Sequence, residues 1–514
     1  MIALAVAWVF RGALAFYFAQ DDFRELAVAA GVLPRRASLW RYLSIQTFMD
    51  VLYPLFRDQP RPYHVASLIL HGANAGLLFA LLSRRFSRPA AFAAASFFAV
   101  HPALFTALYW VSARPDILAT TFALGTVALA LTRGPERWLA VPAFAASLLC
   151  KESTLLVPAA IALLEAWRSP PARAEGAPAS RRPIALLSVL FAMSLGLGLY
   201  LVFSWQAGGF GPGTAYAFDF GVSVLRNLLT YVGWTVDLPA LTPGLRFVDV
   251  QNPALFPLAI GALAFAGLLG LWPAARKRGW WIGVASFLLL LAPVLPLRNH
   301  AYHYYLYAPL AAAALCLAAL VDTLLSLLPQ PGPEASGLDP AARRDARARE
   351  DVAWMAAGTC WLLLTLNGAR VVGQMERRPS PVYPAMRADS TVDRALIAER
   401  VIQGLRRARI PNGTYLVFIL RERIARNARI AKGSGEAPPS REEVYPETNV
   451  KVALLGGLGV RALVSAVDSV RFATTLGTPD PRARYVLYAP TGEVEVFDAA
   501  SLDSLLRSSW VTRW

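Results

Sequence analysis

The 514-residue chain is poor in cysteine and in charged residues. Its three cysteines, Cys150, Cys316 and Cys360, lie in or at the ends of apolar runs, without metal-ligand spacing or a recognisable disulfide pairing. They argue against a cysteine-metal module and fit thiols buried in a membrane. Charged residues make up 16% and hydrophobic residues 56% of the chain, which excludes an ordinary soluble globular protein.

Acidic residues are scarce relative to basic ones. The chain has 34 Asp and Glu against 50 Lys and Arg, a net charge of +16. Such an excess is found in nucleic-acid-binding proteins. Here, however, much of the positive charge lies in short loops between apolar runs. We therefore expect membrane lipids, and no nucleic acid, as partners.

Long apolar runs dominate the first 370 residues. Runs of about 20 residues are long enough to cross a ~30 Å hydrocarbon core as helices. The sequence predicts a polytopic α-helical membrane protein with about eleven transmembrane helices. These cover residues 1–18, 64–82, 89–106, 115–132, 137–150, 153–167, 183–204, 254–272, 279–297, 305–327 and 352–370.

The loops between these runs differ in charge. One alternate set is basic throughout and comprises residues 83–88, 132–137, 168–183, 274–279 and 340–350. The positive-inside rule places that set in the cytoplasm and the opposite set, with everything after residue 370, outside. Arg-heavy, Lys-poor, Ala-rich usage is typical of a GC-rich bacterial genome, which indicates the cell (inner) membrane. The uncharged start and Arg11 argue against a cleaved signal peptide, and a misassigned start codon is the alternative.

The extracytoplasmic segments include two long loops and a tail. Residues 19–63 and 205–253 each contain a candidate interfacial helix, at 39–56 and 222–241. Residues 371–514 have β-rich runs at 413–420, 460–466 and 483–499, and helical periodicity at 390–408. We therefore divide the chain into a transmembrane domain, 1–370, and a small extracytoplasmic α/β domain, 371–514.

Ionisable side chains gather at the extracytoplasmic ends of the predicted spans, where their cost indicates a function. The set is Asp21, Asp22, His64, His101, Arg114, Asp116, Lys151, Glu152, Arg298, His300 and His303. Loops that bring acids, bases and cations to one depth are expected to meet in one cavity.

Structural explanations compete with a functional one. Asp22 followed by Glu25 resembles a capping box that opens a helix at 23–30. His71 and Asn74, one turn apart inside a span, suit interhelical hydrogen bonds better than a substrate site. The stretch at 101–116 also suits a simple polar hairpin, and the tyrosines at 302–307 suit an aromatic belt.

The order and spacing of several motifs resemble the GT-C superfamily of membrane glycosyltransferases. Within it, they are most similar to protein O-mannosyltransferase-like proteins and to the membrane half of the transmembrane-and-TPR O-mannosyltransferases. The similar stretches are "FAQDDF" (18–23), "YHVASLILHGANAGLLFALLSRR" (63–85), "HPALFTALYWVSARPDILAT" (101–120), "LLCKESTLLVPAAIALLEAW" (148–167), "LRNLLTYVGWTVDLPAL" (225–241) and "RNHAYHYYLYAPL" (298–310). One departure is Thr106, where the family often has Glu, and the tail is not TPR.

The resemblance implies transfer of a sugar, with a mannose-like sugar favoured, from a polyprenyl phosphate. The acceptor is a hydroxyl on a protein, glycan or lipid, and a single displacement inverts the anomeric centre. By motif position, Asp21 or Asp22 is the base, with Asp21 slightly preferred, and partial desolvation would raise its pKa. Asp116 orients the acceptor or, in metal-dependent relatives, shares Mg or Mn with Asp21. The sequence lacks a clean DxD motif, so no metal is assigned.

The remaining polar residues are given binding roles by the same resemblance. Four cations are available for the departing phosphate: Lys151, Arg114, Arg298 and His303. Further substrate contacts are expected from His64, His101, Glu152, His300, Tyr304 and Tyr307.

Two other classes of function fit a polytopic chain. A transporter or flippase of lipid-linked substrates would place polar groups along a path, but the ionisable residues cluster at one face rather than at mid-membrane. A non-catalytic scaffold would have lost catalytic residues, and Thr106 is the best support for it. Within the GT-C superfamily, aminoarabinose or mannose transfer to a glycolipid is a further alternative.

Overall fold

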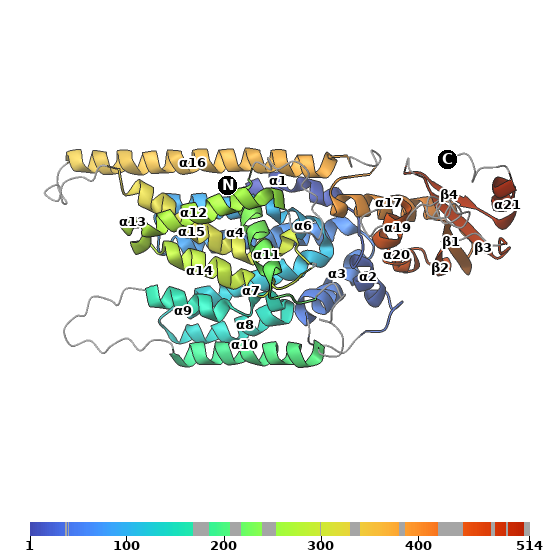
Figure 1. The fold of residues 1–514 in the computed structure, drawn as a ribbon, viewed down its shortest axis with the longest axis horizontal. Helices are drawn as coiled ribbons and strands as arrows, with labels where there is room; N and C mark the ends of the chain where they lie inside the picture. Colours follow the sequence, from blue (N-terminus) through green and yellow to red (C-terminus); the bar gives the residue numbers. More distant parts are fainter. Residues whose placement is uncertain are drawn as a thin grey trace.

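A computed structural model describes the chain except for residues 36–38, 40, 168–183, 206–216, 239–252, 299, 329–339, 380–385, 420–445, 474–477, 490–491 and 508–514. The described residues form an elongated bundle of helices with a smaller α/β part beyond one end (Figure 1). The predicted basic loop 168–183, the glycine-rich stretch 206–216 and part of the predicted interfacial helix 222–241 lie outside the described residues.

Short and long helices alternate along the bundle. Its first half contains α1 (Ile2–Val9), η1 (Arg11–Ala15), α2 (Asp22–Ala29), the π-helix η2 (Tyr42–Thr47), α3 (Phe48–Phe56), α4 (Pro60–Leu82), α5 (Arg88–Ala99), η3 (Pro102–Leu104), α6 (Phe105–Tyr109), η4 (Val111–Ala113), α7 (Arg114–Ala130), η5 (Pro135–Leu139), α8 (Ala140–Cys150), η6 (Glu152–Thr154) and α9 (Val157–Trp167). Its second half contains α10 (Ile184–Trp205), α11 (Val222–Val236), η7 (Pro253–Leu255), α12 (Phe256–Leu271), α13 (Pro273–Lys277), α14 (Trp280–Leu291), η8 (His303–Leu306), α15 (Tyr307–Leu325) and α16 (Pro340–Arg377).

Small side chains build the centre of the bundle. α5 is alanine-rich, and every residue from Pro89 to Ala99 is buried. The helix packs against α4, α15 and α16, which lie around it. Alanines allow helices to approach closely, which is how helices associate where the surrounding medium is itself apolar.

Every range predicted to cross the membrane contains helix. Among the described residues, five helical stretches are long and apolar enough to do so: Pro60–Leu82, Ile184–Phe203, Pro253–Leu271, His303–Leu325 and Arg347–Arg377. The predicted range 1–18 is divided between α1 and η1. In the predicted range 89–106, α5 and the helix Pro102–Tyr109 meet at a bend of 45°. The bend has a local cause, because His101 is extended and precedes Pro102.

Predicted basic loops meet at one end of the bundle. Trp167, at the end of α9, packs on Phe86 and donates from its indole N–H to the backbone oxygen of Lys277 at 3.3 Å. The predicted loop 340–350 is wrong, because these residues form the first turns of α16. The helix continues there because the segment is rich in alanine and arginine, which are strong helix formers.

The C-terminal part is an α/β unit, as the sequence indicates. It consists of α17 (Ser390–Arg407), β1 (Thr414–Ile419), α19 (Pro446–Ala453), α20 (Leu458–Leu463), β2 (Val467–Ala473), β3 (Ala483–Tyr488), β4 (Val494–Phe497) and α21 (Ala499–Arg507). The sheet order is β2-β1-β3-β4; β1 is parallel to both neighbours and β4 is antiparallel to β3.

The predicted strands at 413–420 and 483–499 and the helix at 390–408 are confirmed. The β-rich run at 460–466 is wrong, because α20 occupies most of it and the strand follows at β2. Gly457, with a φ of 94°, turns the chain into α20, and the helix then packs on α2 of the bundle. Packing therefore outweighs the β-propensity of the valines there.

This C-terminal unit shares a hydrophobic core with the bundle. Phe18, Phe23 and Met49 are buried in one cluster with Val401 and Leu416 of the α/β unit, among others. Figure 1 shows α17, α19 and α20 beside α2 at this end. The unit is thus held directly over the segment that carries Asp21 and Asp22.

Candidate functional site

Asp22 is a buried residue with a full set of hydrogen-bond donors. Only 2% of its surface is exposed. One carboxylate oxygen accepts from the Ala19 backbone N–H at 3.0 Å, and the other accepts from the Ser112 N–H and hydroxyl at 2.7 and 2.5 Å. Burial raises the pKa of Asp22 to about 7, against the lowering effect of these hydrogen bonds. Asp22 thus ties α2 to the hairpin at 101–116.

Asp21 lies in a different environment, although it is the neighbouring residue. It occupies the N-cap position of α2, is exposed, and makes no capping hydrogen bond through its side chain. The surrounding protein nevertheless excludes water and raises the pKa of its carboxyl group, while Arg24, Arg41 and Arg394 act in the opposite direction. Asp21 is therefore accessible, and it is surrounded by positive charge.

The predicted capping box is wrong. The Glu25 carboxylate pairs with the Arg114 guanidinium at 2.5 Å instead of returning to the start of its helix. Arg114 is completely buried; its Nε donates to the Ser44 backbone oxygen at 2.9 Å, and its guanidinium carbon lies 3.9 Å from the centre of the Phe48 ring. An acidic partner is needed because a buried guanidinium without one is very costly.

A second buried ion pair lies beside the first. Lys151 Nζ contacts the Asp116 carboxylate at 2.5 Å, and both side chains are 4% exposed. The ammonium also lies 4.8 Å from the ring centres of Tyr304 and Tyr305. Cation–π contacts of this kind stabilise a desolvated ammonium. The predicted residues Asp116, Lys151 and Tyr304 are thus brought together.

Arg41 and Glu152 form a third pair in the same region. Two guanidinium nitrogens contact the two carboxylate oxygens at 3.2 and 2.5 Å. Burial alone would raise the pKa of Glu152, but the charge and hydrogen bonds of Arg41, with Lys151, lower it to about 2. Glu152 is therefore ionised, and its main structural partner is a residue that the motif analysis did not identify.

The predicted histidines are distributed over this end of the bundle. His64 contacts the Leu108 backbone oxygen at 3.3 Å, and His101 contacts that of Thr235 at 3.0 Å. His303 stacks on Trp234 with ring centres 3.9 Å apart. His300 is buried, which lowers its pKa to about 4, and the charges of Lys151 and Arg41 add to this effect. His300 thus lies close enough to the ion pairs for the charges of Lys151 and Arg41 to affect its pKa.

Tyr307 is the first residue of α15 and is completely buried. Its hydroxyl contacts His71 Nδ1 at 2.7 Å and accepts from the Asn74 amide at 3.1 Å. The other ring nitrogen of His71 contacts the Ala99 backbone oxygen at 2.9 Å. These contacts connect α4, α5 and α15, so the predicted interhelical role of His71 and Asn74 is confirmed and extends to Tyr307.

Arg298 is the predicted cation that the structure leaves outside this group. It is exposed, and its backbone N–H donates to the Ala217 oxygen at 3.0 Å. No contact that the structure describes joins it to Lys151 or Arg114. Two of the other predicted cations, Lys151 and Arg114, are paired with buried carboxylates, and the fourth, His303, is buried against Trp234. Binding of an incoming phosphate by these two would require their present pairs to open.

A metal shared by Asp21 and Asp116 does not fit this geometry. The Asp116 carboxylate is paired with Lys151, so a cation already occupies its neighbourhood. Within the described ranges, no group of three or more His, Cys, Asp or Glu side chains is placed to hold a metal ion. We derive no step through a metal.

Sequence reasoning missed three residues that organise the site. Ser112 binds Asp22, Glu25 neutralises Arg114, and Arg41 neutralises Glu152. Ser112 and Arg114 belong to a motif that the sequence analysis singled out, and Glu25 follows Asp22 by three residues. For Arg41, the sequence offers no comparable signal, since its partner is 111 residues away.

Comparison of the chain with protein-family models, with curated proteins and with solved structures finds no match.

Proposed function

We propose that this chain is a membrane glycosyltransferase of the GT-C type. In this proposal all eleven predicted spans cross the membrane, and the Asp21 end faces the periplasm. The enzyme transfers a sugar, with a mannose-like sugar favoured, from a polyprenyl phosphate to a hydroxyl of a protein, glycan or lipid. Support comes from the resemblance of the motifs between residues 18 and 310, and from the geometry of the residues these motifs carry.

The observation that carries the proposal is the difference between the two aspartates. The Asp22 carboxylate accepts three hydrogen bonds and positions the hairpin at 101–116. Asp21 is exposed, has no capping hydrogen bond, and has a raised pKa, which makes it a stronger base than an ordinary aspartate. A general base needs both access to the acceptor and an elevated pKa, and Asp21 combines them.

The reaction follows from this assignment. The Asp21 carboxylate takes the proton of the acceptor hydroxyl, and the acceptor oxygen forms a bond to the anomeric carbon of the sugar. The bond between that carbon and the phosphate oxygen breaks, polyprenyl phosphate leaves with the bonding electrons, and the configuration inverts. Arg24, whose side chain is exposed and whose charge acts on Asp21, is an accessible cation for the departing phosphate.

In this scheme the buried ion pairs are a framework rather than the reacting groups. Glu25–Arg114, Asp116–Lys151 and Arg41–Glu152 connect α2, η2, α7 and the turn after α8. A framework of this kind holds a catalytic carboxylate at a fixed position relative to its substrates, which is where much of the rate enhancement of such enzymes originates.

The test is transferase activity in membranes that contain the wild type, Asp21→Asn, Asp22→Asn or the surface control Asp468→Asn. Each receives radiolabelled polyprenyl-phosphate mannose or another lipid-linked sugar, with periplasmic acceptors. We expect Asp21→Asn to lose at least about 100-fold in rate with unchanged thermal stability, since general acid–base catalysis contributes roughly 10²–10⁴-fold. Asp22→Asn should lose stability as well as activity, and Asp468→Asn should lose neither.

Full activity in Asp21→Asn would refute the assignment of the base. If the wild type consumes no lipid-linked sugar at all, the proposed enzyme class is wrong, and flipping of a fluorescent polyprenyl phosphate across vesicles becomes the next measurement. A positive result there would favour the transporter, and a negative one would favour the scaffold.

A further inference from the structure

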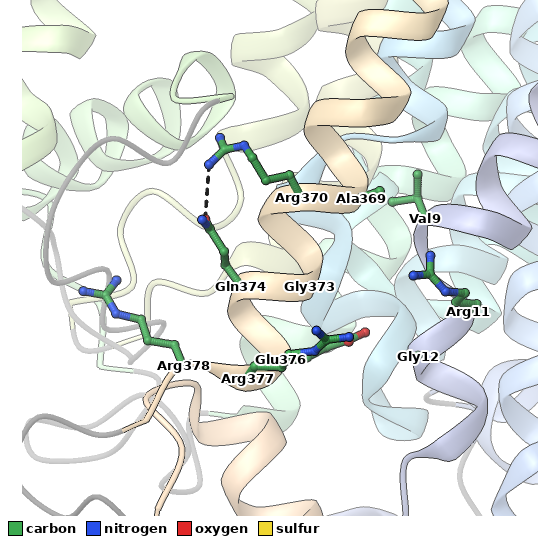
Figure 2. A pocket seen from close by; sticks show the side chains of 10 residues that line it. All are labelled: Val9, Arg11, Gly12, Ala369, Arg370, Gly373, Gln374, Glu376, Arg377 and Arg378. Atoms are coloured by element: carbon green, nitrogen blue, oxygen red, sulfur yellow. Dashed lines mark hydrogen bonds between the residues drawn. The ribbon is translucent and has the colours of Figure 1, made fainter.

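A polar cavity of about 830 Å³ lies between the start of the chain and the C-terminal part of α16. Figure 2 shows the side chains of η1 and of α16 that surround it. Its lining consists of Val9, Arg11, Gly12, Ala369, Arg370, Gly373, Gln374, Glu376, Arg377 and Arg378. None of the predicted catalytic or phosphate-binding residues is among these.

Positive charge dominates this cavity. Four arginines stand against a single carboxylate, Glu376. Arg11 Nη1 donates to the Trp8 backbone oxygen at 2.6 Å, and Arg370 donates to the side-chain oxygens of Asn367 and Gln374 at 3.1 and 3.3 Å. These three acceptors are neutral, and the hydrogen bonds orient the two guanidinium groups.

The one carboxylate of the cavity is engaged elsewhere. Glu376 accepts a short hydrogen bond from the hydroxyl of Tyr109. Tyr109 is buried, and its ring stacks on Phe105 with centres 3.9 Å apart. Glu376 is thereby held toward the hairpin at 101–116, and the cavity wall is connected to the same hairpin that carries Ser112 and Arg114.

The surface that leads to the cavity along α16 is apolar. Leu362, Leu363 and Leu366 expose 47%, 62% and 49% of their surfaces, and they precede Arg370 by one to two helical turns. This part of α16 belongs to one of the stretches that are long and apolar enough to cross a membrane. An apolar helix face that ends at a group of arginines matches an amphiphile with an acyl or prenyl chain and an anionic head group.

We propose that this cavity binds the phosphate head group of a membrane lipid, with the lipid chain lying along the exposed leucines of α16. Guanidinium groups bind phosphate oxygens through paired, charge-assisted hydrogen bonds, and arginines of two segments, η1 and the end of α16, line this cavity. The site is separate from the Asp21 site and does not depend on the proposed transferase activity.

The test uses the purified full chain in an uncharged detergent, with a fluorescent phosphatidic acid as the probe. We expect the double variant Arg370→Gln/Arg377→Gln to bind the probe at least about tenfold more weakly, because it loses two guanidinium groups that can form charge-assisted hydrogen bonds with the phosphate. The matched control is Arg461→Gln/Arg482→Gln, two exposed arginines of the α/β unit, which should bind as the wild type does. Thermal unfolding of each variant checks that it is folded.

A second variant tests the charge argument independently of arginine loss. Glu376→Gln removes the single negative charge of the cavity and should tighten probe binding by a few-fold. Two competitors identify the source of the ligand: diacylglycerol, which lacks phosphate, and inorganic phosphate, which lacks the chain. Neither should displace the probe at concentrations where unlabelled phosphatidic acid does.

Equal affinity in the double variant and the wild type would overturn the proposal. Displacement by inorganic phosphate alone would also overturn the lipid assignment, because the ligand would then be a soluble phosphate. Displacement by diacylglycerol would show that the apolar chain, rather than the phosphate, is recognised.

Discussion

The two ends of the helical bundle carry their charges in different ways. At the end near Asp21, Arg114 and Lys151 are almost completely buried, and each contacts a carboxylate. At the opposite end, Arg84 donates to the Ala128 backbone oxygen, and the Arg85 guanidinium lies 4.5 Å from the centre of the Trp167 ring. Long basic side chains can keep their charged ends in water while their stems cover apolar surface.

The difference shows what the number of charges can and cannot indicate. The arginines at 84, 85 and 278 belong to the basic loops from which the orientation of the chain in the membrane is predicted. That prediction uses only the number of positive charges in each loop. At the Asp21 end, the buried charges of Arg114 and Lys151 each have a specific partner from another segment. The effect of a substitution should therefore depend on burial and pairing rather than on the sign of the charge.

The largest expected effect is the difference in stability between a substitution of Arg114 and a substitution of Arg85, at opposite ends of the bundle. Arg114→Ala leaves Glu25 buried and unpaired, and should lower the free energy of unfolding by about 3–5 kcal/mol. Arg85→Ala loses an exposed cation–π contact, which contributes about 0.5–1 kcal/mol. The measurement is thermal unfolding of both purified variants, followed by tryptophan fluorescence. Equal losses of stability in the two variants would contradict the distinction between buried, paired charges and exposed ones. The double variant Glu25→Leu/Arg114→Met, which removes both charges, should recover most of the stability.

A pH series tests the burial of Asp22. In the folded protein the pKa of Asp22 is about 7, compared with an ordinary value of 3.8. Between these two pH values the Asp22 carboxyl group is therefore protonated in the folded protein and ionised in the unfolded chain. This contribution to stability is complete below about pH 4 and is lost as the pH rises through 7, by roughly 4 kcal/mol.

The pH series compares Asp22→Asn with the wild type. Asparagine does not titrate, so the stability of the wild type relative to the variant should fall between pH 4.5 and 8 by about that amount. The measurement is the unfolding midpoint of each protein at intervals across this range. Parallel profiles would mean that Asp22 is ionised in the folded protein throughout, as its three hydrogen-bond donors favour.

A smaller effect is expected where the C-terminal unit meets the bundle. A Cβ atom at Gly459 would lie 2.7 Å from the Phe23 ring, which is completely buried. Gly459→Val should weaken this contact by about 1–3 kcal/mol and increase amide hydrogen exchange in residues 20–26. Gly358→Val, at a glycine with no atoms near the added Cβ, is the control. Unchanged exchange would contradict docking of α20 on α2.

The smallest effect should come from the ion pair at the basic end. The Arg278 and Asp322 side chains are 31% and 18% exposed, and Arg278 Nε donates to Asp322 at 2.7 Å. Asp322→Asn should cost at most about 1 kcal/mol, and the cost should decline with added salt. Unfolding midpoints at low and high salt measure this. A loss comparable to that of Arg114→Ala would show that both ends depend equally on pairing.

The sequence allowed part of the site to be predicted and not the rest. Asp21, Asp116 and Lys151 could be placed at one end because apolar runs alternate with loops along the chain. Their partners could not be predicted. Asp22 meets Ser112 across 90 residues, and Arg41 meets Glu152 across 111, and neither separation leaves a periodic pattern in the sequence.

Local chemistry alone determined several features of this protein. Apolar runs specify the helices, and short runs rich in β-branched and aromatic residues specify β1 and β3, because each signal lies within a few residues. Only the tertiary structure decided that 460–466 forms α20 rather than a strand, since that helix gains its contacts from α2. It also decided that Asp21 is exposed while Asp22 is buried, because the hairpin and the C-terminal unit cover one side of α2 and not the other.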